Sequence, residues 1–257
     1  MSSEVKFDSE SAVLAAAKLR TINDSEPNDV FVAGYPKSGN TWMQYLLAGA
    51  IFGSDARLVP DSLIQDLVPD VHYKAFYRRY LTPTFFKTHE LPQPRHRKVV
   101  YLVRDGRDVM VSYFHHQTVL GKSVDFSKLI ATGEGLFPCR WHEHIEAWAA
   151  NPYGAEMITI SYEMLKGDAI AVLRRICEFA GIERERTYLE DAVRNSSFEI
   201  LQAKEKKVGW REDSVWPRDK FFVRRGKVGS FKDEMPDDLL RAFMAQSEPA
   251  LRRFGYL

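Results

Sequence analysis

Short apolar runs alternate with longer amphipathic segments along most of the chain. Four runs rich in valine, isoleucine and phenylalanine predict buried strands, at 29–33, 84–89, 98–103 and 156–161. Apolar residues at helical spacing follow Thr41 and Val109, and they recur at 169–180 between an N-cap at Asp168 and a stop at Gly181. Strands that alternate with helices in this way predict one α/β domain, with a central, mostly parallel sheet flanked by helices.

The segment 60–80 carries aromatic residues at spacings of one, three and four, which predicts a helix with one aromatic face. These residues are His72, Tyr73, Phe76, Tyr77 and Tyr80. A face packed on the core is the favoured interpretation. A lid over an apolar substrate would use the same residues, and both alternatives stay open.

A strand, a sharp turn and a helix start follow one another between Phe31 and Trp42, which predicts a P-loop-like phosphate site. Gly34 and Gly39 match the G-x-x-x-x-G spacing of nucleotide triphosphate loops. Backbone N–H groups of such a turn, with the positive end of the helix dipole behind them, form an anion site. Lys37 adds a full charge. The alternative is a strand-turn-helix corner with a solvated lysine.

The loop departs from the triphosphate motif directly after Gly39. Asn40 and Thr41 stand where that motif has lysine followed by serine or threonine. The usual arrangement for holding Mg²⁺ is therefore incomplete, and we expect a group transfer that requires no metal.

Polar residues follow two further predicted strands. His89 stands at the end of one, where α/β sheets keep their ligands. Arg104 follows another and can hold a phosphate through two parallel hydrogen bonds. The alternative for Arg104 is an Arg–Asp surface network, which usually contributes less than about 1 kcal/mol. A long segment at 208–232 carries tryptophans, glycines and arginines, and loops of this length are usually functional or mobile.

Composition narrows the partners and the compartment. The formal net charge of the 257 residues is +1, so we expect no nucleic-acid partner, and any anion site is local. Cys139 and Cys177 are too few for a disulfide framework and favour buried thiols in a reducing compartment. The polar start of the chain lacks the pattern of a signal peptide, which predicts a cytoplasmic location. We interpret 38–54 as a core helix rather than a membrane span. We interpret 1–28 as a mobile or helical extension, and 1–257 as a single domain.

Four histidines raise the question of a metal site. His115 and His116 are adjacent, and adjacent side chains on a helix point in different directions; His142 and His144 lie further on. Known metal motifs pair histidines and carboxylates at spacings that do not occur here, so we expect no metal site.

Four motifs occur in order along the chain: Y-P-K-S-G-N-T-W at 35–42, F-F-K-T-H at 85–89, V-Y-L-V-R-D at 100–105 with Ser112-Tyr113, and F-V-R-R-G at 222–226. In these motifs the chain resembles the soluble sulfotransferases over nearly its whole length after residue 28. Members of that family pass the sulfuryl group of 3′-phosphoadenosine 5′-phosphosulfate (PAPS) to a hydroxyl or amine of a small acceptor, and release 3′-phosphoadenosine 5′-phosphate (PAP).

The resemblance implies a role for each motif residue. Lys37 would contact the bridging oxygen of the phosphosulfate, and His89 with Lys87 would form the catalytic pair. Arg104 and Ser112 would hold the 3′-phosphate, on which the basic-basic-glycine element at 224–226 would close. The implied nucleotide-binding residues are Lys37, Ser38, Gly39, Asn40, Thr41, Trp42, Arg104, Ser112, Tyr162, Ser196, Phe198, Arg224, Arg225 and Gly226.

The chemistry accounts for these residue types. Sulfuryl transfer, like phosphoryl transfer, is expected to have a loose in-line transition state that positioning and charge stabilise. His89 can take the acceptor proton, a contribution of about 10²–10⁴-fold for a general base. Lys37 can neutralise the leaving phosphate, and Lys87 the sulfuryl oxygens, a role that a metal fills in many phosphoryl-transfer enzymes.

Departures from the family pattern leave some properties open. Ser196 replaces a more familiar threonine, and Ser230-Phe231 replaces a common Asp-Trp pair. The residues after Lys232 do not match the dimer motif of animal members, so the oligomeric state and the acceptor are not predicted. The alternative functions are an ATP- and Mg²⁺-dependent phosphotransferase and a non-catalytic nucleotide-binding module. The missing lysine after Gly39 argues against the first, and His89 argues against the second.

Overall fold

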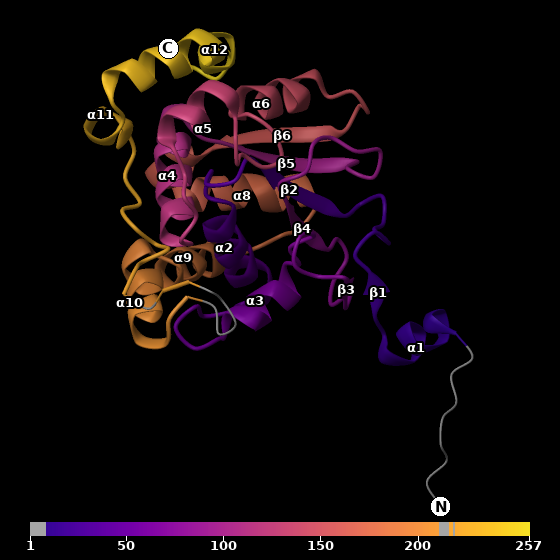
Figure 1. Cartoon of the computed structure of the whole chain (residues 1–257). Coiled ribbons are helices and arrows are strands. Elements are labelled where there is room, and N and C mark those ends of the chain that lie inside the picture. Colours follow the sequence, from indigo (N-terminus) through magenta and orange to yellow (C-terminus); the bar gives the residue numbers. More distant parts are fainter. Residues whose placement is uncertain (1–8, 211–215, 218) are drawn as a thin grey trace, which may run out of the picture.

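The computed structural model describes residues 9–210, 216–217 and 219–257. Its centre is a four-stranded, entirely parallel sheet in the order β4–β2–β5–β6 (Figure 1). The strands are β2 (Val30–Gly34), β4 (Phe85–Thr88), β5 (Lys98–Val103) and β6 (Glu156–Ser161). The predicted strands are thus confirmed, with β5 and β6 correct to the residue and β2 displaced by one, but the edge strand β6 is only partly buried, contrary to the prediction.

Helices cover both faces of this sheet, as predicted (Figure 1). One face packs against α2 (Asn40–Phe52), α3 (Asp61–Leu67), α8 (Ala169–Ala180), α9 (Arg186–Asn195) and α10 (Phe198–Val208). The other packs against α4 (Gly106–Val119), α5 (Phe126–Thr132), α6 (Trp141–Ala150), α11 (Phe231–Glu234) and α12 (Asp237–Arg253). The remaining elements are α1 (Glu10–Ala17), the paired strands β1 (Arg20–Thr21) and β3 (Phe76–Tyr77), and α7 (Tyr162–Gly167).

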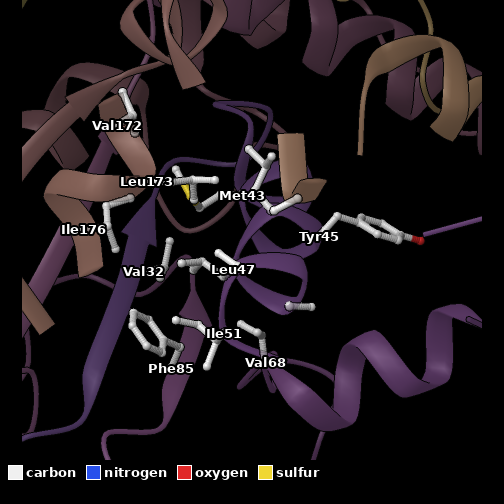
Figure 2. Packing of buried hydrophobic residues seen from close by; sticks show 14 of the residues in the cluster. Val32, Met43, Tyr45, Leu47, Ile51, Val68, Phe85, Val172, Leu173 and Ile176 are labelled. Atoms are coloured by element: carbon white, nitrogen blue, oxygen red, sulfur yellow. The ribbon is translucent and has the colours of Figure 1, made fainter. Parts of the chain in front are cut away.

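The side chains of β2 explain why both faces need a cover. Successive residues of a strand point to opposite faces, and all five residues of β2 are buried. Val30 and Val32 join the core beneath α2 and α8, which Figure 2 shows around Val32, whereas Phe31 and Ala33 join the core on the other face. An uninterrupted apolar run is therefore what this strand requires.

The predicted helix over 60–80 is wrong beyond Leu67. Proline at 69 cannot continue a helix and disfavours helical geometry at the residue before it. The chain instead runs beside β4, where Asp70 forms a parallel bridge with Lys87. There is consequently no single aromatic face: Tyr77 is buried in the core and Tyr73 is 69% exposed.

Two other expectations concern the two cysteines and the N-terminal extension. Cys177 is a buried free thiol, but Cys139 is only partly buried, so the expectation of two buried thiols holds for one. The extension contains α1 and β1, while residues 1–8 lie outside the described part. No helix in the described ranges is long and apolar enough to cross a membrane.

The strand order fixes where a ligand can bind. The chain leaves β2 for β4 on one side and then returns past β2 to β5 on the other side. Such a reversal opens a crevice at the carboxyl ends of the strands, the usual ligand site of parallel α/β sheets. The loops that begin at Tyr35, His89 and Arg104 all start at this edge.

Candidate active site

A cavity of about 950 Å³ opens at this edge of the sheet. Most of the residues that the sequence motifs single out line it, although they come from segments nearly 190 residues apart. Those that line it are Lys37, Gly39, Asn40, Thr41, Trp42, Lys87, His89, Arg104, Ser112, Tyr162, Phe198, Arg224, Arg225 and Gly226. Ser38 and Ser196 are not part of the lining and are buried behind it.

The loop between β2 and α2 is tightly constrained. The Tyr35 carbonyl accepts a 2.8 Å hydrogen bond from the Asn40 side chain, which closes the loop on itself. Lys37 and Gly39 have φ values of 74° and 97°, in the left-handed region. A Cβ on Gly39 would lie 2.8 Å from the Tyr162 ring, so only glycine fits here. The sharp turn that the sequence predicted is confirmed.

Lys37 lies in a strongly electropositive place. Burial and, to a smaller extent, the charges of Arg104, Lys87 and Arg224 lower the pKa of its ammonium to about 7. The ammonium lies 4.0 Å from the centre of the Phe222 ring. A phosphate group beside Lys37 would oppose all of these charges at once, so the site favours an anion.

Several buried polar atoms at the site have no hydrogen-bond partner among the described residues. They include Ser38 Oγ, Asn40 Oδ1, Arg104 Nε and Ser196 Oγ. A buried polar atom without a partner costs free energy, so the atoms of Asn40 and Arg104, two residues that line the cavity, fit a polar ligand that would satisfy them. Trp42 is oriented by a 2.8 Å hydrogen bond from its indole N–H to the Ser196 carbonyl. The residues present thus fit a bound nucleotide.

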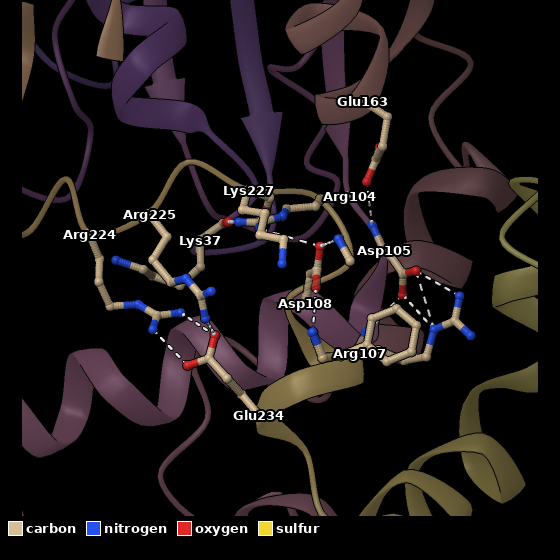
Figure 3. A network of polar contacts seen from close by, with 12 residues as sticks. Lys37, Arg104, Asp105, Arg107, Asp108, Glu163, Arg224, Arg225, Lys227 and Glu234 are labelled. Atoms are coloured by element: carbon tan, nitrogen blue, oxygen red, sulfur yellow. Dashed lines mark hydrogen bonds and ion pairs between the residues drawn. The ribbon is translucent and has the colours of Figure 1, made fainter. Parts of the chain in front are cut away.

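Arg104 belongs to a buried network rather than to a surface one. It donates to the Lys37 carbonyl at 3.2 Å and packs on the Tyr162 ring at 4.4 Å. Asp108, which is buried, accepts backbone hydrogen bonds from Gly229 at 2.8 Å and Phe231 at 2.9 Å (Figure 3). Nothing in the sequence singles out Asp108, because the backbone groups that it binds lie more than 120 residues away.

The predicted basic-basic-glycine element is tied to an acidic side chain. Glu234 accepts hydrogen bonds from Arg224 at 2.7 and 3.1 Å, from Arg225 at 2.6 Å, and contacts His115 at 2.8 Å (Figure 3). Burial opposes ionisation of Glu234, but these hydrogen bonds prevail and lower its pKa to about 2. The sequence predicts no role for Glu234, which belongs only to the residues after Lys232 that depart from the dimer motif.

Gly226, the last residue of that element, is also held in place. Its φ is 58°, and a Cβ there would lie 2.7 Å from the Phe198 ring. The backbone therefore passes directly over a ring that the motifs assign to the nucleotide. Glycine is the residue that permits this approach.

Lys87 lies in β4 and His89 follows the last residue of that strand, and both line the cavity. The Nδ1 of His89 donates a 2.7 Å hydrogen bond to the Gly34 carbonyl, which assigns the proton of neutral His89 to Nδ1 and leaves Nε2 able to accept one. Burial, together with the charge of Lys87, lowers the pKa of His89 to about 3. Lys87 forms a buried 2.7 Å ion pair with Asp70, and the His89 backbone donates to His72 at 2.9 Å. Asp70 was not singled out in the sequence.

Part of the long segment at 208–232 is anchored to α10. The Glu205 side chain accepts hydrogen bonds from the backbones of Phe222 and Val223 at 2.5 and 3.0 Å. Trp210 stacks on Phe222 with ring centres 3.9 Å apart. Within this segment, 211–215 and 218 lie outside the described residues, and α11 begins at its end.

The adjacent histidines of α4 point in different directions, as predicted. His115 contacts Glu234, whereas His116 packs against Trp216 and Phe222. In the described ranges, no three histidine, cysteine, aspartate or glutamate side chains are grouped so that they could hold a metal ion.

Comparisons with known proteins agree with this site. Residues 27–255 match the family model described as "Sulfotransferase domain". Human "Sulfotransferase 2A1" is 30% identical over 207 residues, covering 72% of this chain and 71% of that protein. The "Flavonol 3-sulfotransferase" of Flaveria bidentis is 27% identical, with 84% of this chain and 79% of that protein covered.

A solved structure shows the same fold. Retinol dehydratase, solved with androsterone and the inactive cofactor PAP, superposes with a TM-score of 0.66 at 23% identity, covering 88% of this chain and 81% of that one. The chain belongs to the sulfotransferase family. It is a PAPS-dependent sulfotransferase that moves a sulfuryl group to small acceptors.

Proposed function

We propose that the enzyme sulfates a hydroxyl or amine of a small acceptor, with His89 as general base and with Lys37 and Lys87 as the charges that stabilise transfer. The observation that carries the proposal is the hydrogen bond from His89 Nδ1 to Gly34, because it leaves Nε2 unprotonated in the cavity that Lys37 and Lys87 also line. A base must face the acceptor and be unprotonated before the reaction.

PAPS, when bound, supplies the sulfuryl group and a phosphate leaving group. His89 takes the proton from the acceptor hydroxyl or amine as the new bond to sulfur forms. Lys37 neutralises the bridging oxygen as the bond from that oxygen to sulfur breaks and its electron pair passes to PAP. Lys87 offsets the charge on the sulfuryl oxygens. In a loose transition state, these fixed charges account for most of the catalysis.

We assign the nucleotide to the rest of the predicted set. Arg104, Ser112 and the 224–226 element would hold the 3′-phosphate, since all of them line the same cavity. The adenine would lie by Trp42, with Tyr162, Ser196 and Phe198 as its other contacts. Support comes from the buried Nε of Arg104, which has no hydrogen-bond partner among the described residues and belongs to the cavity lining.

The residues on the acceptor side of the cavity support the proposal that the acceptor is partly apolar. Tyr73, Phe137 and Leu120 line the cavity together with His89, and Tyr73 is largely exposed. The lid interpretation of Tyr73 therefore stays a proposal. Among relatives, one is named for flavonols and one for luciferin, so acceptors differ widely within the family. A cytoplasmic location also stays a prediction.

Transfer of labelled sulfate from PAPS to a panel of phenols, alcohols and amines, with EDTA present, tests the proposal. We expect labelled product and PAP in equal amounts. Tight PAP binding without turnover on the whole panel would favour the binding module. Phosphate transfer from ATP that requires Mg²⁺ would favour the phosphotransferase.

A further inference from the structure

The segment that replaces the expected helix runs along the outer side of β4. The Lys87 backbone N–H donates to the Pro69 carbonyl at 2.8 Å, and Val71 donates to the Lys87 carbonyl at 3.0 Å. These two bonds fix Asp70 directly beside Lys87. A sequence-distant loop is thus held in register with the strand that carries the proposed catalytic pair.

Both carboxylate oxygens of Asp70 are used. Oδ2 lies 2.7 Å from the ammonium of Lys87, and Oδ1 accepts the backbone N–H of His72 at 3.0 Å. Asp70 is fully buried and the Lys87 side chain is 4% exposed. Burying two charges is costly, and an apolar pair of similar volume is often as stable or more stable, so stability alone is a weak reason for this pair.

His72 connects the same carboxylate to His89. Its Nε2 accepts the backbone N–H of His89 at 2.9 Å, and the two imidazole rings stack 5.5 Å apart. Asp70 therefore orients the side chain of Lys87 directly and the backbone of His89 through His72. One buried acidic residue holds both members of the pair.

Resting on the function proposed above, we infer that Asp70 is a positioning residue for sulfuryl transfer, which keeps Lys87 charged and aligned and fixes His89 through His72. A buried ammonium without an acidic partner tends to lose its proton. Lys37, His89 and His72 lie close enough to Lys87 that a positive charge on any of them opposes the charge of Lys87. The carboxylate of Asp70 counters these charges.

The test is Asp70→Asn, which keeps the shape and the bond to His72 but removes the charge. We expect kcat to fall by about tenfold or more at neutral pH, with PAP affinity within about threefold of wild type. Activity should also fall with rising pH at a lower pH than in wild type, because Lys87 loses its proton earlier without the negative charge of Asp70. Asp70→Glu, which keeps the charge, should restore part of the activity and return the pH profile toward that of wild type.

Asp29→Asn is the matched control. Asp29 is also fully buried and pairs with Arg79 at 2.6 Å, away from the cavity lining. It should lower stability but leave the pH profile of kcat unchanged. An Asp70→Asn enzyme with wild-type kcat and pH profile would overturn the inference, and so would a change no larger than that of Asp29→Asn.

A double-substitution cycle separates positioning from a general structural role. If Asp70 acts through Lys87, adding Asp70→Asn to Lys87→Met should lower kcat by no more than about twofold further. Losses that multiply would refute action through Lys87. If Lys87→Met and His89→Gln are themselves fully active, the proposed function fails; if both lose most of their activity while Asp70→Asn keeps the kcat and the pH profile of wild type, only this inference fails.

Discussion

Glu234 accepts two hydrogen bonds from the guanidinium of Arg224, at 2.7 and 3.1 Å, in the geometry in which arginine also binds phosphate (Figure 3). Arg225 donates to the same carboxylate at 2.6 Å. Two of the three arginines assigned to the 3′-phosphate, Arg224 and Arg225, thus already have an anionic partner within the chain. A phosphate bound to these arginines would compete with Glu234 and be repelled by its charge.

Glu234→Gln should therefore bind PAP more tightly, by about threefold to tenfold, because it removes one like charge at partly screened distance. Affinity for ADP, which lacks the 3′-phosphate, should change by less than about twofold. Isothermal titration calorimetry at two salt concentrations would measure both. Weaker PAP binding by Glu234→Gln would mean that Glu234 instead holds the arginines ready for the phosphate.

The nucleotide assignment makes a second prediction. PAP should raise the melting temperature of the protein clearly more than ADP or ATP at equal concentration, because Arg104, Ser112 and Arg224 are assigned to a 3′-phosphate. Stabilisation by a ligand follows RT ln(1 + [L]/Kd), about 2.7 kcal/mol at one hundred times Kd. A thermal shift titration measures it. Equal shifts with PAP and ADP would remove the 3′-phosphate assignment.

The parts of the fold that sequence predicts well are those that local pattern decides. β5 is an apolar run after Lys98, β6 is rich in β-branched residues, and α8 is bounded by an Asp168 side chain that accepts from Ala171 and by Gly181 in the left-handed region. The helix predicted over the 60–80 segment was wrong because local pattern does not decide the structure of this segment. Its aromatic spacing imitates a helix, but Pro69 and backbone pairing with β4 determine the structure there.

The site residues also divide into those that local sequence pattern predicts and those that it does not. Motif residues such as Lys37 and Arg104 stand directly after strands, so parallel topology brings them together at one edge. Asp70, Asp108 and Glu234 were missed because their roles depend on partners distant in the chain or on backbone that only the fold positions. An acidic residue in a loop carries no sequence signal of what it will face.

A third prediction concerns acid stability. In the folded protein, burial and the Lys87 charge lower the pKa of His89 to about 3, against 6.5 without these effects. The unfolded chain therefore binds more protons between these two pH values, and stability falls as pH falls through that window. His116 and His144, with pKa values lowered to about 3 and about 4 by burial, act in the same direction.

His89→Gln removes one of these three contributions. Its melting temperature should consequently fall less than that of wild type between pH 7 and about pH 4.5. Differential scanning calorimetry at several pH values would show the difference. Parallel curves for the two proteins would show that the pKa of His89 is not lowered in the folded state.

The last prediction separates the roles of His89 and Lys37. A base acts only in the transition state, so its loss lowers kcat and kcat/KM together, whereas a cation on the phosphosulfate also stabilises the ground state. His89→Gln keeps polarity and approximate size but cannot take a proton near neutral pH. It should lose about 10²-fold or more in kcat, with PAP affinity within about threefold. Lys37→Gln should weaken both turnover and PAP binding. Steady-state kinetics with PAP titrations would measure both variants, and a His89→Gln enzyme with most of its activity toward a good acceptor would refute the assignment and direct attention to Lys87 or to an acceptor that is already ionised.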